Sequence, residues 1–598
     1  MVEQPVDVCI LGLGVAGGVI AAEAALAGYR VVGIEKGPYW DYAKDFSMTK
    51  YDEWGIMYHR KFDHPLRLFT YTLRNNSNQM AVPVRRNIGS QIITPGHGVG
   101  GMAQHYGGMM GRFGSWAYQM RSQTVSRYGQ DRLNSVAPTN DIEDWPYTYS
   151  EIEPYYVEWE RAFGVTGTNQ GPFQPQSQNF PMPPHPYTPV AAQGFAALES
   201  MGYHPYPMPT SLASVAYVNQ YGVQVNACVY DGWCGSPCNF QCETGAKANA
   251  AYRTIPAAMK SGNFTMALNC FVFRLDVDPG TKLVTAARYY DAQGRVHVQP
   301  AKAFYNGLWG FNLVRAFLLS GVGAPYNPAT VTGSMGRGPQ YGVPPPAVSS
   351  VSGTLDVGGN AYPSGNAEGG AVDMLDLADD NFDHAGLDFI GGGMLRLATY
   401  YGGGPQNLIG IAGQVSGASM GSAFKAGLKD YYLLTKTKVS LSMDGPNLPD
   451  QRWYVDADPH YTDWYGDPLA RYTTAYSDNA YSAARYLSGS NDSPATKILQ
   501  RMGCHDISVN EGVSPNSIPM DNWPAHVRGG CRMGIDPRTS ALNKYGQMWD
   551  CANVFAGGEI TDTTGDNTTI GGTHPMGAAL YVHAEGIRRY LQSPGPLV

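Results

Sequence analysis

The chain has 598 residues and a formal net charge of −8, with 43% hydrophobic and 15% charged residues. This length exceeds what one hydrophobic core supports, so two or three domains are expected, and 73 Gly and 42 Pro indicate a folded protein rich in loops. The negative charge and the lack of a Lys/Arg-rich block argue against nucleic acid as a partner, because its phosphate backbone would be repelled.

The amino terminus is apolar, but it lacks the basic region and cleavage site of a signal peptide. No other stretch approaches 18 uninterrupted apolar residues, so no segment is expected to span a membrane alone. Export or membrane attachment would therefore have to come from a partner.

The first thirty-five residues predict a nucleotide-binding unit. Residues 6–11 (VDVCIL) form an apolar strand, a helix of small residues follows over 15–28, and a second strand over 30–34 ends in Glu35. A GxGxxG turn joins the first strand to the helix, through Gly12, Gly14 and Gly17. Such glycines allow a tight turn, a close approach of backbone to pyrophosphate and close helix packing, while the acid accepts ribose hydroxyls. The pattern predicts a bound dinucleotide.

A second glycine-rich run follows about eighty residues later, TPGHGVGGMAQHYGGMMGRF over 94–113. An enzyme that binds only NAD does not require a second glycine-rich run. An extended FAD, in contrast, needs a second backbone surface beside its isoalloxazine. Gly100 and Gly101 are the residues expected to supply that surface. The run therefore favours FAD over NAD.

Four of the nine cysteines fall within fifteen positions, separated by five, three and three residues: Cys228, Cys234, Cys238 and Cys242. Closely spaced thiolates suit an iron–sulfur cluster, which moves single electrons. Structural zinc usually joins two ligand pairs a dozen or more residues apart, and disulfides across three-residue loops tend to be strained and gain little loop entropy. Iron–sulfur is favoured, with zinc and disulfides kept as alternatives.

Four segments, in this order, resemble the glucose–methanol–choline (GMC) oxidoreductases: the amino-terminal fingerprint, the 98–108 loop, FLLSGVG at 317–323 and HVRGGCRMG at 526–534. Within the family, the chain resembles the FAD flavoprotein subunits of bacterial membrane-associated gluconate, fructose and glucose dehydrogenases. Segments typical of the gluconate 2-dehydrogenase type are TLRNNSNQMAVPVRRNIGS, DIEDWPYTYSEIEPYY, DNFDHAGLDFIGGG and SALNKYGQMWDCANVF.

The resemblance implies FAD and an iron–sulfur cluster. His105 lies in GGMAQHYGG, similar to the segment that in some members carries flavin covalently; a histidine that only packs near the ring is the alternative. The family cluster is usually three-iron with three cysteine ligands, ahead of a CPxxAKY-like stretch that CETGAKANA at 242–250 resembles. Because this chain has four cysteines, 3Fe-4S with a spare cysteine and 4Fe-4S both stay open.

Alcohol oxidation needs a base for the hydroxyl proton while hydride leaves carbon, and a histidine suits this task. His526 matches the active-site histidine position of the family. For the second catalytic position, the first choice is His574, ahead of an apolar terminal helix, and Asn567 is the alternative. His583 is expected within that helix.

The segment NVFAGGE at 553–559 resembles the family strand and turn that return to the FAD pyrophosphate and ribityl chain. Gly558 and Glu559 are therefore expected to bind the cofactor. Elsewhere, KVSLSM at 438–443 and RWYVDAD at 452–458 are expected as strands of an antiparallel sheet on the substrate side.

The expected fold is α/β, a Rossmann-like FAD domain of GMC type with an α+β substrate domain built on an antiparallel sheet. The FAD domain would comprise 1–45, 85–120, 215–325 and 520–598. The substrate domain would comprise 46–84, 121–214 and 326–519.

The expected function is oxidation of a hydroxyl of a sugar, sugar acid or polyol, with electrons leaving through the cluster. The resemblance implies a small exported partner subunit, a membrane cytochrome c subunit feeding quinone, and a periplasmic, membrane-associated location. The alternatives are an oxidase that passes electrons to oxygen and keeps its cysteines structural, and a flavin-dependent lyase or isomerase.

Overall fold

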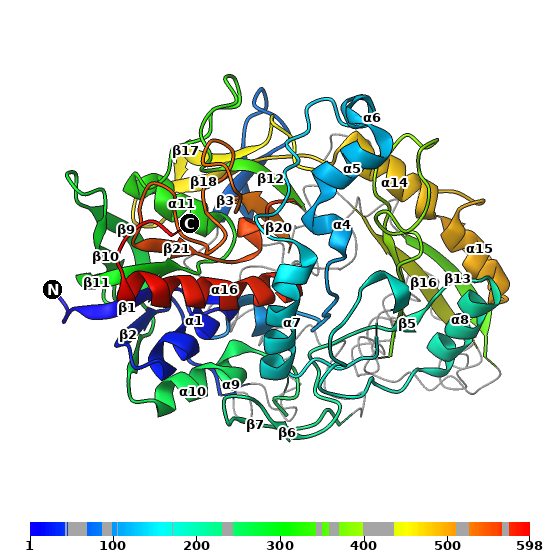
Figure 1. Cartoon of the computed structure of the whole chain (residues 1–598), viewed down its shortest axis with the longest axis horizontal. Coiled ribbons are helices and arrows are strands. Elements are labelled where there is room, and N and C mark those ends of the chain that lie inside the picture. The colour runs from blue at the N-terminus through cyan, green and yellow to red at the C-terminus, as the bar shows by residue number, and fades with distance from the viewer. Residues whose placement is uncertain are drawn as a thin grey trace, which may run out of the picture.

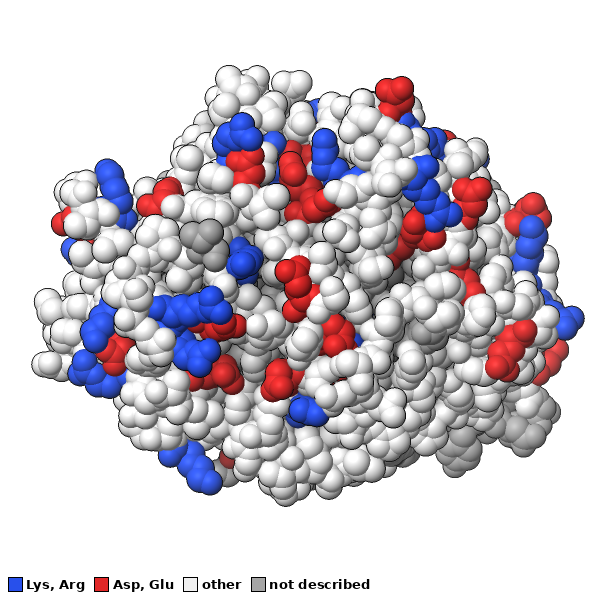
Figure 2. Space-filling view, viewed as in Figure 1, with Lys and Arg blue, Asp and Glu red and all other residues white. Residues whose placement is uncertain are grey.

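The computed structural model describes residues 1–41, 45, 69–85, 98–104, 106–169, 171–229, 242, 244–341, 350–357, 370–398, 436–445, 447–509, 526–564 and 573–597. Three large sheets organise these residues, the first in the left half of Figure 1 with the second above it and the third at the right. On the face in Figure 2, basic and acidic side chains are interspersed.

The first sheet is parallel at its centre. Its order is β8-β2-β1-β11, with β21 beside the carboxyl end of β11 and the β10–β9 hairpin beside the amino end. Its strands are β1 (Val6–Leu11), β2 (Val31–Ile34), β8 (Phe264–Ala267), β9 (Phe271–Val277), β10 (Val284–Tyr290), β11 (Val296–Asn306) and β21 (Val554–Ala556). The apolar run 8–11 within β1 is explained by its burial on both faces.

Helices cover both faces of this sheet. On one face, α1 (Val15–Leu26) packs against α10 (Ile255–Lys260) and α16 (Thr573–Gln592), and α16 also packs against α7 (Tyr149–Phe163) (Figure 1). On the other face, α11 (Phe311–Ser320) contacts β9 and the second sheet. Both layers are hydrophobic, and each contains side chains of β1.

The second sheet has the order β20-β12-β17-β18-β3-β4 and contains one parallel pair, β18 with β3. Its strands are β20 (Val527–Gly530), β12 (Arg337–Tyr341), β17 (Tyr454–Thr462), β18 (Pro468–Thr473), β3 (Phe69–Arg74) and β4 (Val82–Arg85).

The third sheet is antiparallel throughout, in the order β19-β13-β16-β15-β14-β5. Its strands are β19 (His505–Val509), β13 (Ser350–Asp356), β16 (Lys436–Asp444), β15 (Met394–Ala398), β14 (Val372–Met374) and β5 (Tyr206–Pro207). A separate apolar core joins it to α8 (Pro189–Ser200), α14 (Asp478–Ser488) and α15 (Pro494–Arg501).

The remaining described elements are short or peripheral. They are η2 (Gly101–Gln104), α4 (Ser115–Tyr118), α5 (Met120–Tyr128), α6 (Gln130–Val136), η3 (Gly171–Phe173), β6 (Tyr217–Val218), β7 (Gln224–Val225), α9 (Ala250–Arg253) and η4 (Glu559–Thr561). Among the helices described, none combines the length and apolarity needed to cross a bilayer.

The structure confirms the mixed α/β fold and the strand–turn–helix–strand unit at the amino terminus. The predicted strands at 438–443 and 452–458 also form, as β16 and β17, but they lie in two different sheets because β17 pairs with β18 and β16 with β13. The division into domain pieces stays a prediction. One predicted substrate piece, the segment of α7, packs on α16 beside the first sheet.

Candidate functional site

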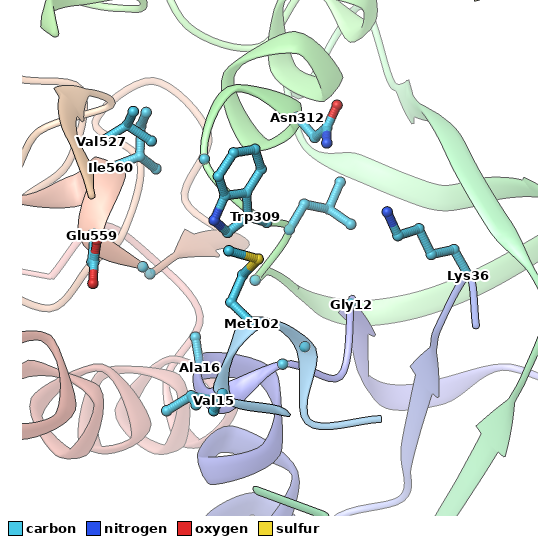
Figure 3. Close-up of a pocket in the computed structure, with 18 of the residues that line it drawn as sticks. Gly12, Val15, Ala16, Lys36, Met102, Trp309, Asn312, Val527, Glu559 and Ile560 are labelled. Atoms are coloured by element: carbon cyan, nitrogen blue, oxygen red, sulfur yellow. The ribbon is translucent and has the colours of Figure 1, made fainter. Parts of the chain in front are cut away.

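A cavity of about 370 Å³ lies at the carboxyl ends of parallel strands of the first sheet. This is the edge at which open α/β sheets bind ligands. Figure 3 shows Glu559, Val527 and Ile560 at one end of the cavity and Lys36 and Asn312 at the other. We call these the His526 end (His526, Val527, Glu559, Ile560 and Thr573) and the Glu35 end (Glu35, Lys36, Cys270, Phe271 and Asn312).

The GxGxxG turn forms the middle of the cavity wall, through Gly12 and Gly14. Gly14 is the N-cap of α1, so the positive end of the helix dipole points at this region. A Cβ atom on Gly17 would lie 2.0 Å from the carbonyl oxygen of Gly12, which excludes any other residue there. The turn therefore offers a backbone surface suited to a pyrophosphate.

The second glycine-rich run lies directly against this turn. The backbone N–H of Gly100 donates to the carbonyl of Leu13 at 2.7 Å, and Gly101 lines the cavity. Gly100 has φ +102°, and a Cβ atom there would lie 2.0 Å from the side-chain oxygen of Asn249. His105 lies outside the described residues, while Ala103 and Tyr106 near it in sequence both line the cavity.

Glu35 binds three backbone N–H groups and so holds three loops together. Its carboxylate accepts from Leu13 at 2.9 Å, from Gly37 at 3.0 Å and from Gly98 at 3.1 Å. The side chain also lines the cavity, next to Lys36. The Glu35 carboxylate, predicted to bind a ribose, thus also fixes the GxGxxG turn against the second glycine-rich run.

The turn between β17 and β18, residues 463–467, closes against the Glu35 end. Arg315 of α11, which lines the cavity, donates to Asp463 at 2.7 Å. The Tyr465 ring stacks on Tyr290 at 4.1 Å and on the cavity residue Phe271 at 5.6 Å. This contribution was not predicted from the sequence, although an arginine within the apolar sequence of α11 was a usable indication of one.

At the His526 end, two titratable side chains face each other. His526 Nδ1 lies 3.5 Å from the Glu559 carboxylate, with the two side chains 24% and 18% exposed. The Thr573 hydroxyl donates to the other carboxylate oxygen at 3.4 Å. Burial alone would raise the pKa of Glu559, but His526, Arg528 and Thr573 outweigh it, so the pKa is lowered and Glu559 is ionised near neutral pH.

His574 does not line the cavity, although it is the second residue of α16. Its ring is fully buried, 3.2 Å from Glu160, and it packs edge-on against Tyr156. Glu160 in turn pairs with buried Arg112 at 2.7 Å. Burial lowers the pKa of His574 against the opposing effect of Glu160, so the ring stays neutral near pH 7.

Among the described residues, His574 is therefore not part of the cavity lining that contains His526. Its catalytic role stays a prediction. Asn567, the alternative for the second catalytic position, lies outside the described residues, and His583 lies within α16 as expected. Glu559, expected only to bind cofactor, is the described titratable residue that faces His526.

The residues lining the cavity fit FAD. A helix amino terminus and bare glycine backbone at the middle suit a pyrophosphate, and a carboxylate at the Glu35 end suits a ribose. The second glycine-rich run and the His526 end extend the cavity beyond a mononucleotide. A histidine and a glutamate, His526 and Glu559, lie at the end of the cavity opposite Glu35.

Only the flanking members of the cysteine run are described. Cys228 and Cys242 pack against one small apolar cluster, formed by Met182, Ala213, Val225 and Ala246. Cys234 and Cys238 lie outside the described residues. Within the part of the chain that the structure describes, no group of three or more His, Cys, Asp or Glu side chains could hold a metal ion.

Comparison with known proteins gives relatives over the full length of the chain. The chain is 32% identical over 616 residues to the gluconate 2-dehydrogenase flavoprotein of Pantoea cypripedii, covering 100% of this chain and 95% of that protein. It is 24% identical to the fructose dehydrogenase large subunit of Gluconobacter japonicus, covering 92% of both. No protein-family model matches the chain.

Among solved structures, the fold is similar to that of pyridoxine 4-oxidase from Mesorbium loti. The TM-score is 0.58 at 14% sequence identity, over 98% of this chain and 100% of that chain. At this identity the likeness shows a common fold.

Proposed function

Because the chain belongs to the GMC oxidoreductases, enzymes that act on alcohol groups with FAD, we propose that it is a dehydrogenase for a hydroxyl of a sugar, sugar acid or polyol. The observation that carries this proposal is the His526–Glu559 pair at one end of a cavity whose middle is lined by the GxGxxG turn. Bound FAD would supply the hydride acceptor at this end.

Residues of the chain would transfer the proton, bind the cofactor and orient the substrate at this site. His526 takes the proton of the substrate hydroxyl as hydride leaves the carbon that bears this hydroxyl. An imidazole is the base suited to this step at neutral pH. Gly12, Gly14 and Gly101, which line the cavity, would hold the cofactor through backbone groups, and Glu35 would accept hydrogen bonds from its ribose. Asn567 stays a candidate to orient the substrate hydroxyl.

The cysteine run is proposed to hold an iron–sulfur cluster that would supply one-electron transfer to a partner. Three hydrogen bonds of the residues that follow Cys242 support a position near the cofactor cavity. Lys247, shortly after Cys242, donates from Nζ to the carbonyls of Gln104 and Tyr106 at 3.1 and 3.0 Å. The Tyr106 hydroxyl donates to the carbonyl of Ala248 at 2.8 Å.

Partners and location follow from the relatives as proposals. One relative is named a large subunit, which supports a multi-subunit assembly for this chain. We include a small exported subunit and a membrane cytochrome c subunit in that assembly, in the periplasm. Covalent attachment of FAD through His105 is part of the proposal, and colour retained by acid-precipitated protein would support it.

The test is an anaerobic titration of the purified, FAD-loaded protein with D-gluconate, D-fructose and D-glucose in turn. We expect one of them to bleach the flavin absorbance, and an artificial dye to restore it. Iron analysis and electron paramagnetic resonance on the same sample should detect the cluster. A sample without iron that consumes oxygen rapidly would favour an oxidase, and turnover without any acceptor would favour a lyase or isomerase.

A further inference from the structure

Glu559 occupies an unusual position for a carboxylate in this cavity. It follows the glycine pair after β21, so its backbone lies at the carboxyl edge of the first sheet. Among the described residues, however, no backbone N–H group donates a hydrogen bond to its carboxylate. It lies between the His526 ring at 3.5 Å and the Thr573 hydroxyl at 3.4 Å.

The charges around Glu559 favour its ionised form. Arg528, two residues beyond His526 on β20, lowers the pKa of Glu559 together with His526 and Thr573. Asp562 lies 3.7 Å from Arg528 and also forms an ion pair with it. The groups that face Glu559 from β20 and α16 are thus a histidine, an arginine and a hydroxyl, and each interacts favourably with a carboxylate.

We propose that Glu559 is the positioning residue for His526, an ionised carboxylate that holds the Nδ1–H tautomer and leaves Nε2 to accept the substrate proton. When the substrate O–H bond breaks, an Nε2–H bond forms, and the positive charge on the ring develops beside Glu559. The carboxylate keeps its own charge throughout. A histidine oriented by a carboxylate in this way is a general device for making a strong, correctly directed base.

This inference rests on the proposed function, and a purely structural role for Glu559 makes different predictions. If the carboxylate only fixes the start of α16 through Thr573, the tautomer of His526 will not depend on it. If it only binds cofactor, its loss will lower FAD content and leave the His526 ring unchanged.

The test compares Glu559→Gln, which removes the charge and keeps the shape, with Glu559→Asp, which keeps the charge. Glu585→Gln makes the same change on the outer part of α16, where Glu585 pairs with Arg589, and serves as the matched control. We expect kcat to fall about 10- to 100-fold or more in Glu559→Gln. Glu559→Asp should recover part of this loss, and Glu585→Gln should equal the wild type.

A second readout does not need turnover. In FAD-loaded, substrate-free protein labelled with nitrogen-15 histidine, the ring signals of His526 are assigned by their loss in His526→Ala. The wild type should show Nδ1 protonated near neutral pH, and Glu559→Gln should shift the ring toward a mixture of tautomers. Identical ring signals in both proteins would overturn the proposal, whatever happens to FAD content.

The two readouts also separate this inference from the function on which it rests. If the wild type bleaches with none of D-gluconate, D-fructose and D-glucose, the proposed function fails, while the ring signals still decide whether Glu559 sets the tautomer. If the wild type is active and Glu559→Gln matches Glu585→Gln in kcat, the positioning role fails and the proposed function stands.

Discussion

Two glutamates follow parallel strands of the first sheet at opposite ends of one cavity, and their surroundings differ. Glu35, after β2, accepts hydrogen bonds from three backbone N–H groups. Glu559, after β21, faces the side chains of His526 and Thr573. Fixed backbone donors make Glu35 part of the scaffold, whereas the neighbouring histidine is the basis of the positioning role proposed for Glu559. The environment decides what each carboxylate does.

The largest expected effect lies at the His526 end. Replacing His526 by Ala should lower kcat about 10²- to 10⁴-fold, because the base for the hydroxyl proton is lost. FAD content should stay at the wild-type level, since the glycine turn and Glu35 are intact. The measurement is dye-coupled turnover on the substrate found by flavin bleaching, corrected for flavin content.

His574→Asn is the matched control for that change. It disturbs a fully buried ring beside Glu160, so it should lower the free energy of unfolding by about 1–3 kcal/mol. Turnover per bound flavin should stay within a few-fold of the wild type. A loss in kcat as large as that of His526→Ala, with flavin retained, would show that His574 is catalytic after all.

An intermediate effect is expected at Glu35. In Glu35→Gln an amide N–H₂ replaces one carboxylate oxygen, so a buried backbone N–H faces a donor, at a cost of about 1–3 kcal/mol. We expect a lower melting temperature and FAD binding weakened by about 10-fold, with unchanged kcat at saturating FAD. FAD affinity is measured in a His105→Ala background, where no covalent bond can hold the cofactor. Unchanged affinity would remove Glu35 from the site.

The smallest effect is expected at the turn that closes the Glu35 end. Tyr465→Ala removes stacking worth about 0.5–1.5 kcal/mol, so FAD should bind a few-fold more weakly in the same background. The neighbouring Trp464, 71% exposed, provides the control as Trp464→Ala. Equal FAD affinities of the two variants would show that the second sheet does not stabilise the Glu35 end of the cavity.

The local parts of this protein follow from short patterns in its sequence. The GxGxxG turn, its two flanking strands and the helix after it were predictable, because glycine placement and apolar runs act within a few residues. The mixed α/β fold, the GMC family and the flavin were predictable too. In each case a motif of adjacent residues carries the information, and no distant contact is needed to recognise it.

Which distant residues contact each other depends on the packing of sheets and helices. Spacing along the chain favoured His574 as the partner of His526, yet α16 turns that ring into a buried contact with α7. Glu559 reaches His526 because β21, in the first sheet, ends at the same cavity at which β20, in the second sheet, begins. Pairings of this kind depend on strand order and helix packing, which short-range sequence patterns do not encode.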